Sequence, residues 1–453
     1  MDDKFQKVVA LAKRRGFAFP SSDLYGGMAN TWDLGPVGTL LKNNLRDSWW
    51  KFFVLDREDI VGIDASIFLN PKVWEASGHV AGFTDALIDC RNCKNRTRAD
   101  HLIEDVLPDK KVEGLTTQQL DEIIKEHEIK CPKCGAFDWT PVRQFNLLFE
   151  TSIGIIEGDK SKSYLRGEIA QGIFLNFKNV LDTTRVKVPF GIAQQGKAFR
   201  NEITMGQFLH RTLEFDLMEF EYFIQPDNWE KTYEYFRDQM MGWAKRIGLR
   251  EENLQWREHE EFERSHYSTK TMDIEYQYPF GWKEIFGIAY RTDFDLKNHA
   301  EHSGKDLSYT DPVTNEKYIP HVVEPTFGLS RLVGVVLFDA YAEDGERVVL
   351  KLHPTIAPYK VAVFPLVKNK EEVTSKARAL FESLQKKFVV AYDDRGNIGK
   401  RYLSQDEIGT PYCVTIDYQT LEDNTVTVRD RDTTQQERVS IDTLEEYITA
   451  KLI

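Results

Sequence analysis

Two kinds of hydrophobic periodicity run along the chain, and together they predict an α+β fold. Apolar residues recur at helical spacing in three segments, residues 4–15, 39–53 and 228–247. Short apolar or alternating runs, which are typical of strands, occupy residues 59–69, 144–149, 173–177 and 215–222. Alternation at residues 284–291 predicts another strand, and the apolar positions after Gly328 predict a helix.

The pattern changes after His353-Pro-Thr-Ile-Ala-Pro358, whose prolines indicate a linker. Beyond it, strand and helix patterns alternate: a strand at 361–366, a helix at 373–384, and strands at 389–392, 412–416 and 425–429. This order predicts a compact α/β domain. We therefore divide the chain into residues 1–356 and residues 357–453.

Composition narrows the class of protein. The chain has 453 residues, of which 41% are hydrophobic and 29% are charged, as in ordinary globular proteins. No apolar run is long enough to cross a membrane, and the start Met1-Asp-Asp-Lys lacks the features of a secretory signal. The expected compartment is the cytoplasm. A net charge of −13 argues against a general nucleic-acid coat, so no DNA partner is expected and any RNA contact must be local.

Four of the five cysteines form two Cys-x-x-Cys pairs, Cys90/Cys93 and Cys131/Cys134. Each pair matches one knuckle of a zinc ribbon, and four thiolates would close the coordination sphere of a structural zinc ion. The spacing between the pairs is wider than usual. It contains an expected acidic helix at 117–128, so we predict a zinc-ribbon-like insertion over residues 88–142. Two reduced pairs without metal are the alternative.

Two neighbouring runs, Phe199-Arg-Asn-Glu-Ile-Thr204 and residues 211–219, suggest a nucleotide platform. Arg200 and Glu202 are two residues apart, which would place both on one face of a strand. Arginine presents a planar fork of donors that suits phosphate, and the carboxylate can accept from an exocyclic amine. A returning strand would carry Phe215 and Glu219 on one face. Taken alone, such a pair is more often a solvated ion pair.

The wider sequence carries a family resemblance. The two runs resemble motif 2 of class II aminoacyl-tRNA synthetases, and Glu324-Pro-Thr-Phe-Gly-Leu-Ser-Arg331 resembles motif 3. Trp32-Asp-Leu-Gly-Pro36 and residues 69–79 are similar to the motif 1 region of glycyl-tRNA synthetases of the single-chain, homodimeric type. Arg166-Gly-Glu-Ile-Ala-Gln-Gly172 also looks like a family motif, although Gly167 and Ile169 replace the usual proline and threonine. The resemblance spans nearly the whole chain.

The resemblance implies an antiparallel-sheet catalytic core and a C-terminal anticodon-binding domain, in a homodimer formed through the motif 1 region. It implies a ligase that activates glycine with ATP to glycyl-adenylate and transfers glycine to the 3′ end of tRNA(Gly). Charge crowding and alignment dominate such a reaction, so cations and positioning should carry it.

The resemblance also assigns the ATP site. Arg200 and Arg331 would be catalytic: Arg200 grips the α-phosphate and the amino-acid carboxylate, and Arg331 covers the adenine and reaches the γ-phosphate. Glu202 accepts from the adenine amine, and Phe215 stacks beneath the purine. Glu284 would hold Mg²⁺ with the ATP, because a hard cation prefers carboxylate oxygen. The remaining ATP contacts are Asn201, His210, Arg211, Ile285 and Gly328.

For glycine, the resemblance points to an acidic pocket that recognises the ammonium group and fills the space of a side chain. The residues that match the family are Arg98, Glu168, Phe215, Glu219, Arg291, Glu324 and Thr326. Rejection of larger amino acids would be steric.

The C-terminal domain offers exposed cations as candidate contacts to anticodon bases, namely Arg395, Lys400, Arg401, Arg429 and Arg431. Arginine can stack on unpaired bases and bond their edges. A solvated surface is the alternative for each.

Two rival functions remain. A non-catalytic synthetase-like protein usually lacks the motif 2 or motif 3 arginine, whereas Arg200 and Arg331 are both present. A ligase for histidine, proline, serine or threonine is disfavoured by the set of acidic pocket residues.

Overall fold

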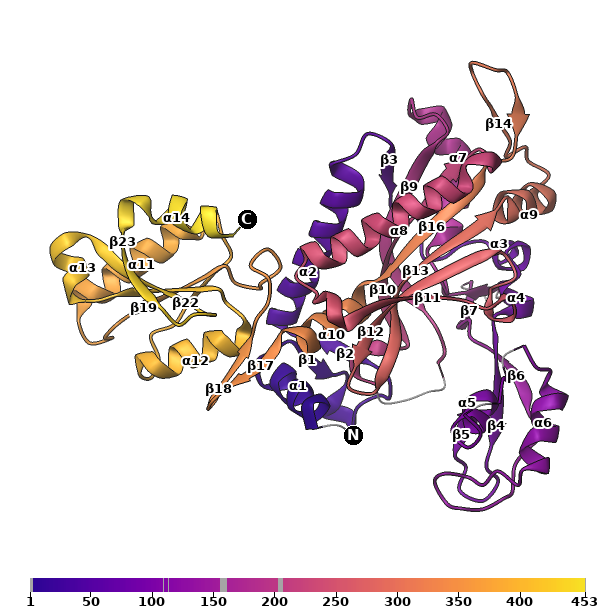
Figure 1. Ribbon diagram of the computed structural model, residues 1–453, viewed down its shortest axis with the longest axis horizontal. Coiled ribbons are helices and arrows are strands. Elements are labelled where there is room, and N and C mark those ends of the chain that lie inside the picture. The colour runs from indigo at the N-terminus through magenta and orange to yellow at the C-terminus, as the bar shows by residue number, and fades with distance from the viewer. Residues whose placement is uncertain (1–2, 109, 113, 155–160, 203–206, 453) are drawn as a thin grey trace.

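A central seven-stranded sheet organises the computed structural model, which describes residues 3–108, 110–112, 114–154, 161–202 and 207–452 (Figure 1). Neighbouring strands are antiparallel except for the edge pair β3 and β9, which is parallel. In spatial order the strands are β11 (Leu254–Glu258), β12 (Lys270–Tyr278), β13 (Gly281–Thr292), β16 (His321–Gly328), β10 (Glu214–Ile224), β9 (Phe190–Phe199) and β3 (Ile60–Ile63).

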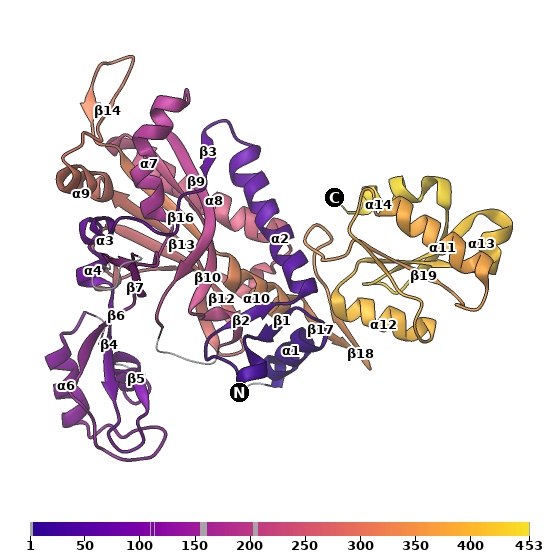
Figure 2. The ribbon, with the colours of Figure 1, turned by 180° about the vertical axis from the view of Figure 1, so that it is seen from behind.

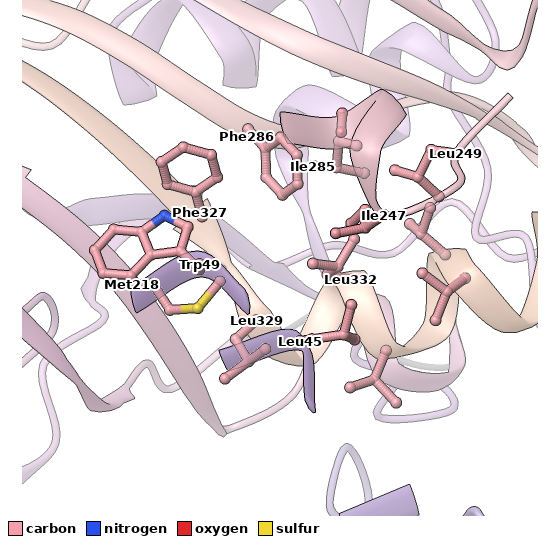
Figure 3. Close-up of a cluster of buried hydrophobic side chains, with 14 of the residues drawn as sticks. Leu45, Trp49, Met218, Ile247, Leu249, Ile285, Phe286, Phe327, Leu329 and Leu332 are labelled. Atoms are coloured by element: carbon pink, nitrogen blue, oxygen red, sulfur yellow. The ribbon is translucent and has the colours of Figure 1, made fainter. Parts of the chain in front are cut away.

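One face of this sheet is apolar and packs against helices α1 (Asp3–Arg14), α2 (Pro36–Trp50), α8 (Trp229–Arg246) and α10 (Leu329–Ala340). Trp49 is fully buried at the centre, with its ring 6.2 Å from that of Phe220 and 5.7 Å from that of Phe327 (Figure 3). Burying a large apolar side chain contributes roughly 1.5–3 kcal/mol, so this cluster is a main source of stability. It holds the sheet rigid beneath the site.

On the opposite face, helices α7 (Ala170–Thr183) and α9 (Phe294–Ser303) cover the end of the sheet near β9 and β10 (Figure 2). Alternation along β10 decides this division, since Met218 and Phe220 join the apolar core whereas Phe223 packs against Phe177 of α7. The helix-free remainder of this face carries polar side chains.

Most predicted elements are confirmed, but three expectations are wrong in detail, one of them being the strand expected at 144–149, which ends at Asn146. Residues 173–177 were expected to form a strand and instead lie inside α7, because Ile173, Phe177 and Val180 recur at helical spacing in a longer segment. A five-residue apolar run cannot show its period. The strand expected at 59–69 is limited to Ile60–Ile63.

The cysteine-containing segment forms a small unit of its own beside the sheet (Figures 1 and 2). Its three strands, in the order β5, β4, β6, and its two helices are β4 (Thr84–Asp89), β5 (Arg96–Arg98), β6 (Arg143–Asn146), α5 (Ala99–Glu104) and α6 (Thr117–Glu126). A capping box at Thr116 and Gln119 begins α6, which confirms the helix expected at 117–128. Its separate apolar core includes Ile88, Leu120 and Ile124.

The C-terminal part has a separate five-stranded sheet and core. The strands, in spatial order, are β20 (Val390–Tyr392), β19 (Val361–Pro365), β21 (Tyr412–Ile416), β22 (Thr425–Asp430) and β23 (Gln436–Ser440). The first three are parallel, and β22 and β23 continue antiparallel. Helices α11 (Glu371–Leu384), α12 (Ile398–Ile408), α13 (Tyr418–Asp423) and α14 (Leu444–Lys451) complete it.

Three of the five cations considered for anticodon contact are not on the surface. Arg401, Arg429 and Arg431 are only 3%, 6% and 2% exposed. Arg429 makes a bidentate pair with Asp406 at 2.8 and 3.0 Å, and Arg401 and Arg431 donate to backbone carbonyls. Their sequence pattern looked like a solvated surface, but their guanidinium groups satisfy buried acceptors instead.

The remaining described elements are short. They include the hairpin of β1 (Ala18–Pro20) and β2 (Trp32–Leu34), α3 (Pro71–Ala76), α4 (His79–Gly82), and the pairs β7 (Glu150–Ile153) with β8 (Ser161–Tyr164), β14 (Tyr309–Thr310) with β15 (Lys317–Tyr318), and β17 (Tyr341–Asp344) with β18 (Arg347–Leu350). Across the described ranges, we find no helix with the length and apolarity needed to cross a membrane.

Candidate active site and metal centre

The polar face of the central sheet forms the floor of a cavity of about 180 Å³. Alternate residues of β10 and β16 point into it, because side chains two apart in a strand share a face. The cavity brings together most of the predicted site residues: Glu168, Arg200, Glu202, His210, Arg211, Phe215, Glu219, Glu284, Glu324, Thr326, Gly328 and Arg331.

Arg200 lies at one wall of this cavity, but not on a strand as expected. Strand β9 ends at Phe199, and the backbone of Asn201 turns away to donate to the Leu147 carbonyl at 2.8 Å. The Arg200 guanidinium donates to the Gly167 carbonyl at 3.0 Å and lies between the rings of Phe83 and Phe215, 5.2 and 5.3 Å from their centroids. These contacts orient the cation without neutralising it.

The same turn decides the position of Glu202, whose carboxylate lies 3.8 Å from the guanidinium of Arg211. Glu202 is therefore next to Arg200 through the chain turn and not through a shared strand face. Ile203 and Thr204, which belong to the same predicted motif, lie outside the described residues.

Arg331 occupies the first turn of α10, and Gly328 before that helix leaves room for it. A Cβ at Gly328 would lie 3.2 Å from Cδ of Arg331. The guanidinium donates to the backbone carbonyl of His210 at 3.1 Å and pairs with Glu284 at 2.8 Å. Burial opposes ionisation of Glu284, but the Arg331 charge outweighs it and lowers the pKa of that carboxyl.

His210 contributes no positive charge to this end of the cavity. Burial, reinforced by the charges of Arg331 and Arg211, lowers the pKa of His210 to about 2, so its imidazole is neutral at physiological pH. The cations facing the cavity here are thus arginines.

A β-bulge at Ile285 brings Glu284 to the cavity. The pairing of β12 with β13 matches Ile274 to Phe286 but Glu275 to Glu284, which leaves Ile285 as the extra residue. Strict alternation would have placed Glu284 and Arg291 on opposite faces, because Arg291 is the seventh residue after Glu284 and residues an odd number of positions apart face opposite sides. The side chain of Ile285 packs in the apolar core (Figure 3).

At the other end of the cavity, carboxylates surround Arg291, which is 1% exposed. Its guanidinium pairs with Asp295 at 2.8 and 2.9 Å and with Glu324 at 2.8 Å. Glu168 accepts from Gln171 at 2.8 Å and lies 3.3 Å from the His79 ring. Burial opposes ionisation of Glu168, but His79 and then Arg291 outweigh it and lower the pKa of the Glu168 carboxyl.

The pKa values of two other carboxyl groups at this end, those of Glu219 and Glu324, shift in the opposite direction. Burial, with neighbouring carboxylates, raises the pKa of Glu219 and of Glu324, although Arg291 opposes the shift. Thr326 stands directly across from Glu219 in the pairing of β10 with β16. This end of the cavity is therefore rich in acceptors and suits a small cation.

Four residues predicted for the ATP or glycine site do not line the cavity: Ile285 lies in the apolar core, Arg291 is buried and paired with Glu324, and the other two are Arg98 and Asn201. Arg98 ends β5 of the small cysteine unit, where it pairs with Asp85 at 3.0 Å and with Asp100, and the charge of Glu202 is close enough to help raise the pKa of Arg98. Asn201 contacts the site through its backbone bond to Leu147.

Sequence reasoning missed Tyr267 and Asp273. The Tyr267 ring stacks on Arg291, with 3.8 Å between its centroid and the guanidinium carbon. Asp273 accepts from His259 at 2.7 Å, and burial together with Glu284 raises its pKa to about 6. Alternation in β12 could have indicated Asp273, whereas Tyr267 lies in an irregular segment without a periodic signal.

The four paired cysteines meet at one point of the small unit. The Sγ atoms of Cys90 and Cys134 are 3.7 Å apart, as are those of Cys93 and Cys131, and all four lie within 4.8 Å of one another. Four thiolates around zinc at about 2.3 Å would have sulfurs roughly 3.8 Å apart, so the cluster fits a tetrahedral ion.

The two loops that carry these cysteines are near copies of each other. In one, Cys90 exchanges backbone hydrogen bonds with Lys94 and Asn95, and in the other Cys131 does so with Gly135 and Ala136. Lys94 and Gly135 both have positive φ, at 61° and 71°. This repeated turn is the knuckle geometry expected of a ribbon half.

Comparison with known proteins decides the family. Three relatives, each named glycine–tRNA ligase, match almost the full length. The protein from Caldanaerobacter subterraneus subsp. tengcongensis is 54% identical over 98% of this chain and 98% of its own. Those from Alkaliphilus oremlandii and Geobacillus thermodenitrificans are 52% and 51% identical, over 99% of this chain and 98% and 97% of theirs. The chain belongs to the glycine–tRNA ligase family.

Two family models locate parts of a glycine–tRNA ligase in this chain. Residues 360–451 match an anticodon binding domain, and residues 109–147 match glycyl-tRNA synthetase insertion domain 1. The first range covers the five-stranded C-terminal sheet, and the second covers the part of the small unit that contains Cys131 and Cys134.

Local packing explains a departure from the glycine–tRNA ligase pattern. A Cβ at Gly167 would lie 3.0 Å from Leu148 and 3.1 Å from Phe83, so these side chains fill the space that a proline ring would need. The Gly167 carbonyl still accepts from Arg200, and the neighbouring Glu168 still faces the cavity.

The cysteine cluster makes a direct prediction. Purified protein should contain one zinc ion per chain, and Cys131→Ser with Cys134→Ser should abolish it, because two hydroxyls replace half of the thiolate ligands. Elemental analysis of protein kept reduced and away from chelators measures this. Cys413→Ser, a change at a buried cysteine outside the cluster, should retain the ion. A wild-type chain without zinc would contradict the prediction.

Proposed function

We propose that this chain is a class II, homodimeric glycine–tRNA ligase that uses the cavity described above to form glycyl-adenylate. One observation carries the proposal: a single cavity has arginines at one end and a buried cluster of carboxyl groups at the other. The first suits a triphosphate and the second suits an ammonium group. Membership in the glycine–tRNA ligase family makes the chain an aminoacyl-tRNA ligase of protein biosynthesis.

In the first step, a carboxylate oxygen of glycine attacks the α-phosphorus of ATP while the bond to the β-phosphate oxygen breaks, so pyrophosphate leaves. Arg200 bridges the carboxylate and the α-phosphate, and Arg331 with Arg211 holds the terminal phosphates. Glu202 and Phe215 hold the adenine. No general base is required, because the attacking group is already an anion. Charge stabilisation and alignment supply the acceleration.

The cavity also fits Mg²⁺ carried with ATP. Glu284 and the neighbouring Asp273 line the phosphate end and offer the carboxylate oxygens that this ion prefers. When bound, Mg²⁺ would neutralise charge that develops on the phosphates. Arg331 already holds Glu284 in place.

The acidic end explains the choice of glycine. Glu168, Glu219 and Glu324 accept from the ammonium group, and Thr326 adds a hydroxyl. Arg291 orients Glu324 from behind. Because these groups occupy the space beside the α-carbon, the methyl group of alanine would collide with them. Such a steric clash discriminates against a larger substrate more strongly than the loss of one methylene contact discriminates against a smaller one.

In the second step, glycine passes from the adenylate to the terminal adenosine of tRNA(Gly). We assign residues 1–356 to catalysis, with a zinc-ribbon-like insertion at 88–142, and residues 357–453 to anticodon binding. The match of residues 360–451 to an anticodon binding domain supports this division. Translation makes the cytoplasm the expected compartment.

Exposed apolar residues near the N-terminus support the homodimer. Leu24, Tyr25 and Met28, between β1 and β2, are 97%, 93% and 58% exposed. Exposed large apolar side chains so close together in the sequence favour association. Leu24→Asp with Tyr25→Asp should therefore convert the dimer to a monomer in analytical ultracentrifugation. Val313→Asp, at an equally exposed residue far from this hairpin, should remain dimeric, and a monomeric wild type would refute the assignment.

The Arg200 role predicts a specific loss of activation. Arg200→Gln should reduce glycine-dependent ATP–pyrophosphate exchange by at least about a hundredfold, as removal of one preorganised donor does elsewhere. Its fold should survive, because the side chain makes one backbone hydrogen bond. Lys197→Gln, at an exposed cation on the preceding strand, is the matched control and should keep full exchange. Near-normal exchange in a folded Arg200→Gln protein would remove Arg200 from the mechanism.

The division of labour predicts separable activities. Deleting residues 358–453 should spare glycine-dependent exchange and greatly weaken tRNA charging. In the full-length chain, Arg395→Ala with Lys400→Ala should also weaken charging, because these two cations remain exposed near the start of α12. Lys386→Ala, beyond α11 on the other side of the sheet, is the control (Figure 1). Full charging by the truncated protein would rule out the anticodon role.

A further inference from the structure

One carboxyl group at the acidic end of the cavity has no role in the proposed reaction. Glu221 lies two residues beyond Glu219 on β10, so both side chains face the same side of the sheet. Glu221 is 0% exposed, and neither of its carboxyl oxygens has a hydrogen-bond partner among the described residues. Buried polar groups are normally paired, so this group calls for an explanation.

Its nearest polar neighbours are also carboxyl groups. One carboxyl oxygen each from Glu219, Glu221 and Glu324 lie within 4.8 Å of one another. Glu219 is 1% exposed, and its Oε1 likewise has no partner. Glu324 is different, because its Oε1 accepts from Arg291. The two groups without a partner are therefore adjacent on one strand.

The cations nearby are already engaged. Arg291, on β13, is shared between Asp295 of α9 and Glu324 of β16. Arg166 donates to the backbone carbonyls of Lys197 and Ala65. The other acidic group facing this cluster, Glu168, is held by His79 and Gln171. Within the described part of the chain, no guanidinium donates to Oε1 of Glu219 or to either oxygen of Glu221, although the charges of Arg291 and Arg166 oppose the rise in the pKa of Glu219.

A neutral hydrogen-bond donor nearby does not supply the missing partner of Glu221. Gln194 of β9 stands directly opposite Glu219, and its Nε2 also has no partner. A hydrogen bond from that amide to Glu219 would give a partner to Glu219 alone. Both oxygens of Glu221 would still be unpaired, and an isolated ionised carboxylate in such a site is strongly disfavoured.

We propose that Glu221 is a positioning residue for glycine: it remains a neutral carboxylic acid and donates its proton to the carboxylate of Glu219. This proton gives both groups a partner and leaves one negative charge between them. The charge faces the site that, under the proposed function, receives the single ammonium group of glycine. Glu221 orients the acceptor and does not touch the substrate.

The electrostatics agree with the geometry. Burial, together with Glu324, raises the pKa of Glu221 well above that of an exposed glutamate, and the same causes raise the pKa of Glu219. Two adjacent carboxyl groups that cannot both ionise are a known way to hold a proton at neutral pH. In such a pair the two carboxyl groups share one proton, and a bound ligand can decide which of them carries it.

Infrared spectroscopy tests the proton directly. Wild-type protein at neutral pH should show the carbonyl stretching band of a protonated carboxylic acid, and Glu221→Gln should lose intensity in that band. Glu214→Gln, at an exposed carboxylate on the same strand, should leave it unchanged. Unchanged intensity in folded Glu221→Gln would overturn the proposal.

Kinetics test the positioning role. Glu221→Gln keeps a neutral donor of nearly the same shape, so the KM for glycine in pyrophosphate exchange should stay within about threefold of wild type. Glu221→Leu removes the donor and should raise that KM about tenfold or more with a smaller change in kcat. An unchanged KM in folded Glu221→Leu, or an equal rise in Glu221→Gln, would each refute the role.

The two tests separate this inference from the proposed function. If the wild-type chain shows no glycine-dependent exchange, the proposed function fails, and the infrared band still reports whether Glu221 is protonated. If exchange is normal and the band does not depend on Glu221, the inference alone fails. Should Glu221→Leu not fold, the Glu221→Gln band decides the outcome.

Discussion

The structure depends on pairing charges that lie on one buried face of a sheet. The cavity floor holds arginines and carboxylates in a region where unpaired ions are costly, and two of its arginines are fixed by carboxylate partners. Arg291 is held by Asp295 and Glu324, and Arg331 by Glu284. Such pairs add little net stability, because desolvation offsets their attraction, but they hold the side chains in one arrangement. That arrangement is the preorganisation that adenylate chemistry requires.

The opposite face makes this possible. Trp49 and its aromatic neighbours bury the back of the same strands against helices, and this packing provides the stability that the charged face lacks. Along β10 and β16 the two environments alternate residue by residue, since Phe327 enters the core while Thr326 faces the cavity. In β13, a bulge moves Glu284 onto the charged face while Ile285 stays in the core.

The small cysteine unit depends on a different source of stability. Its apolar core is limited, and three short strands with two helices bury too little surface to be secure alone. A metal held by Cys90, Cys93, Cys131 and Cys134 would supply the missing stability. The unit lies close to the phosphate end of the cavity, where Arg98 is near Glu202. Its rigidity therefore matters for the site as well as for its own fold.

The sequence by itself determined the helices with strong periodicity, four of the five strands of the C-terminal sheet, the cysteine pairs and the family. These features are local, or depend on residue types at fixed spacing, so they can be read without coordinates. The family resemblance assigned Glu219, Glu324 and Thr326 to one pocket, and the pairing of β10 with β16 is what brings them into one cavity. The match of Arg200 and Arg331 to two motifs similarly located the arginine end of the cavity.

Only the tertiary structure decided which charged side chains are exposed and which are buried. Arg401, Arg429 and Arg431 look like surface cations in the sequence, yet distant acceptors bury them. The turn after Phe199 and the bulge at Ile285 arise from pairing with other strands, which no local pattern encodes. Glu221 was indistinguishable from any strand glutamate until folding buried it where, among the described residues, its only close polar groups are other carboxyls. The cause is common to all three: burial and pairing depend on residues far apart in the chain.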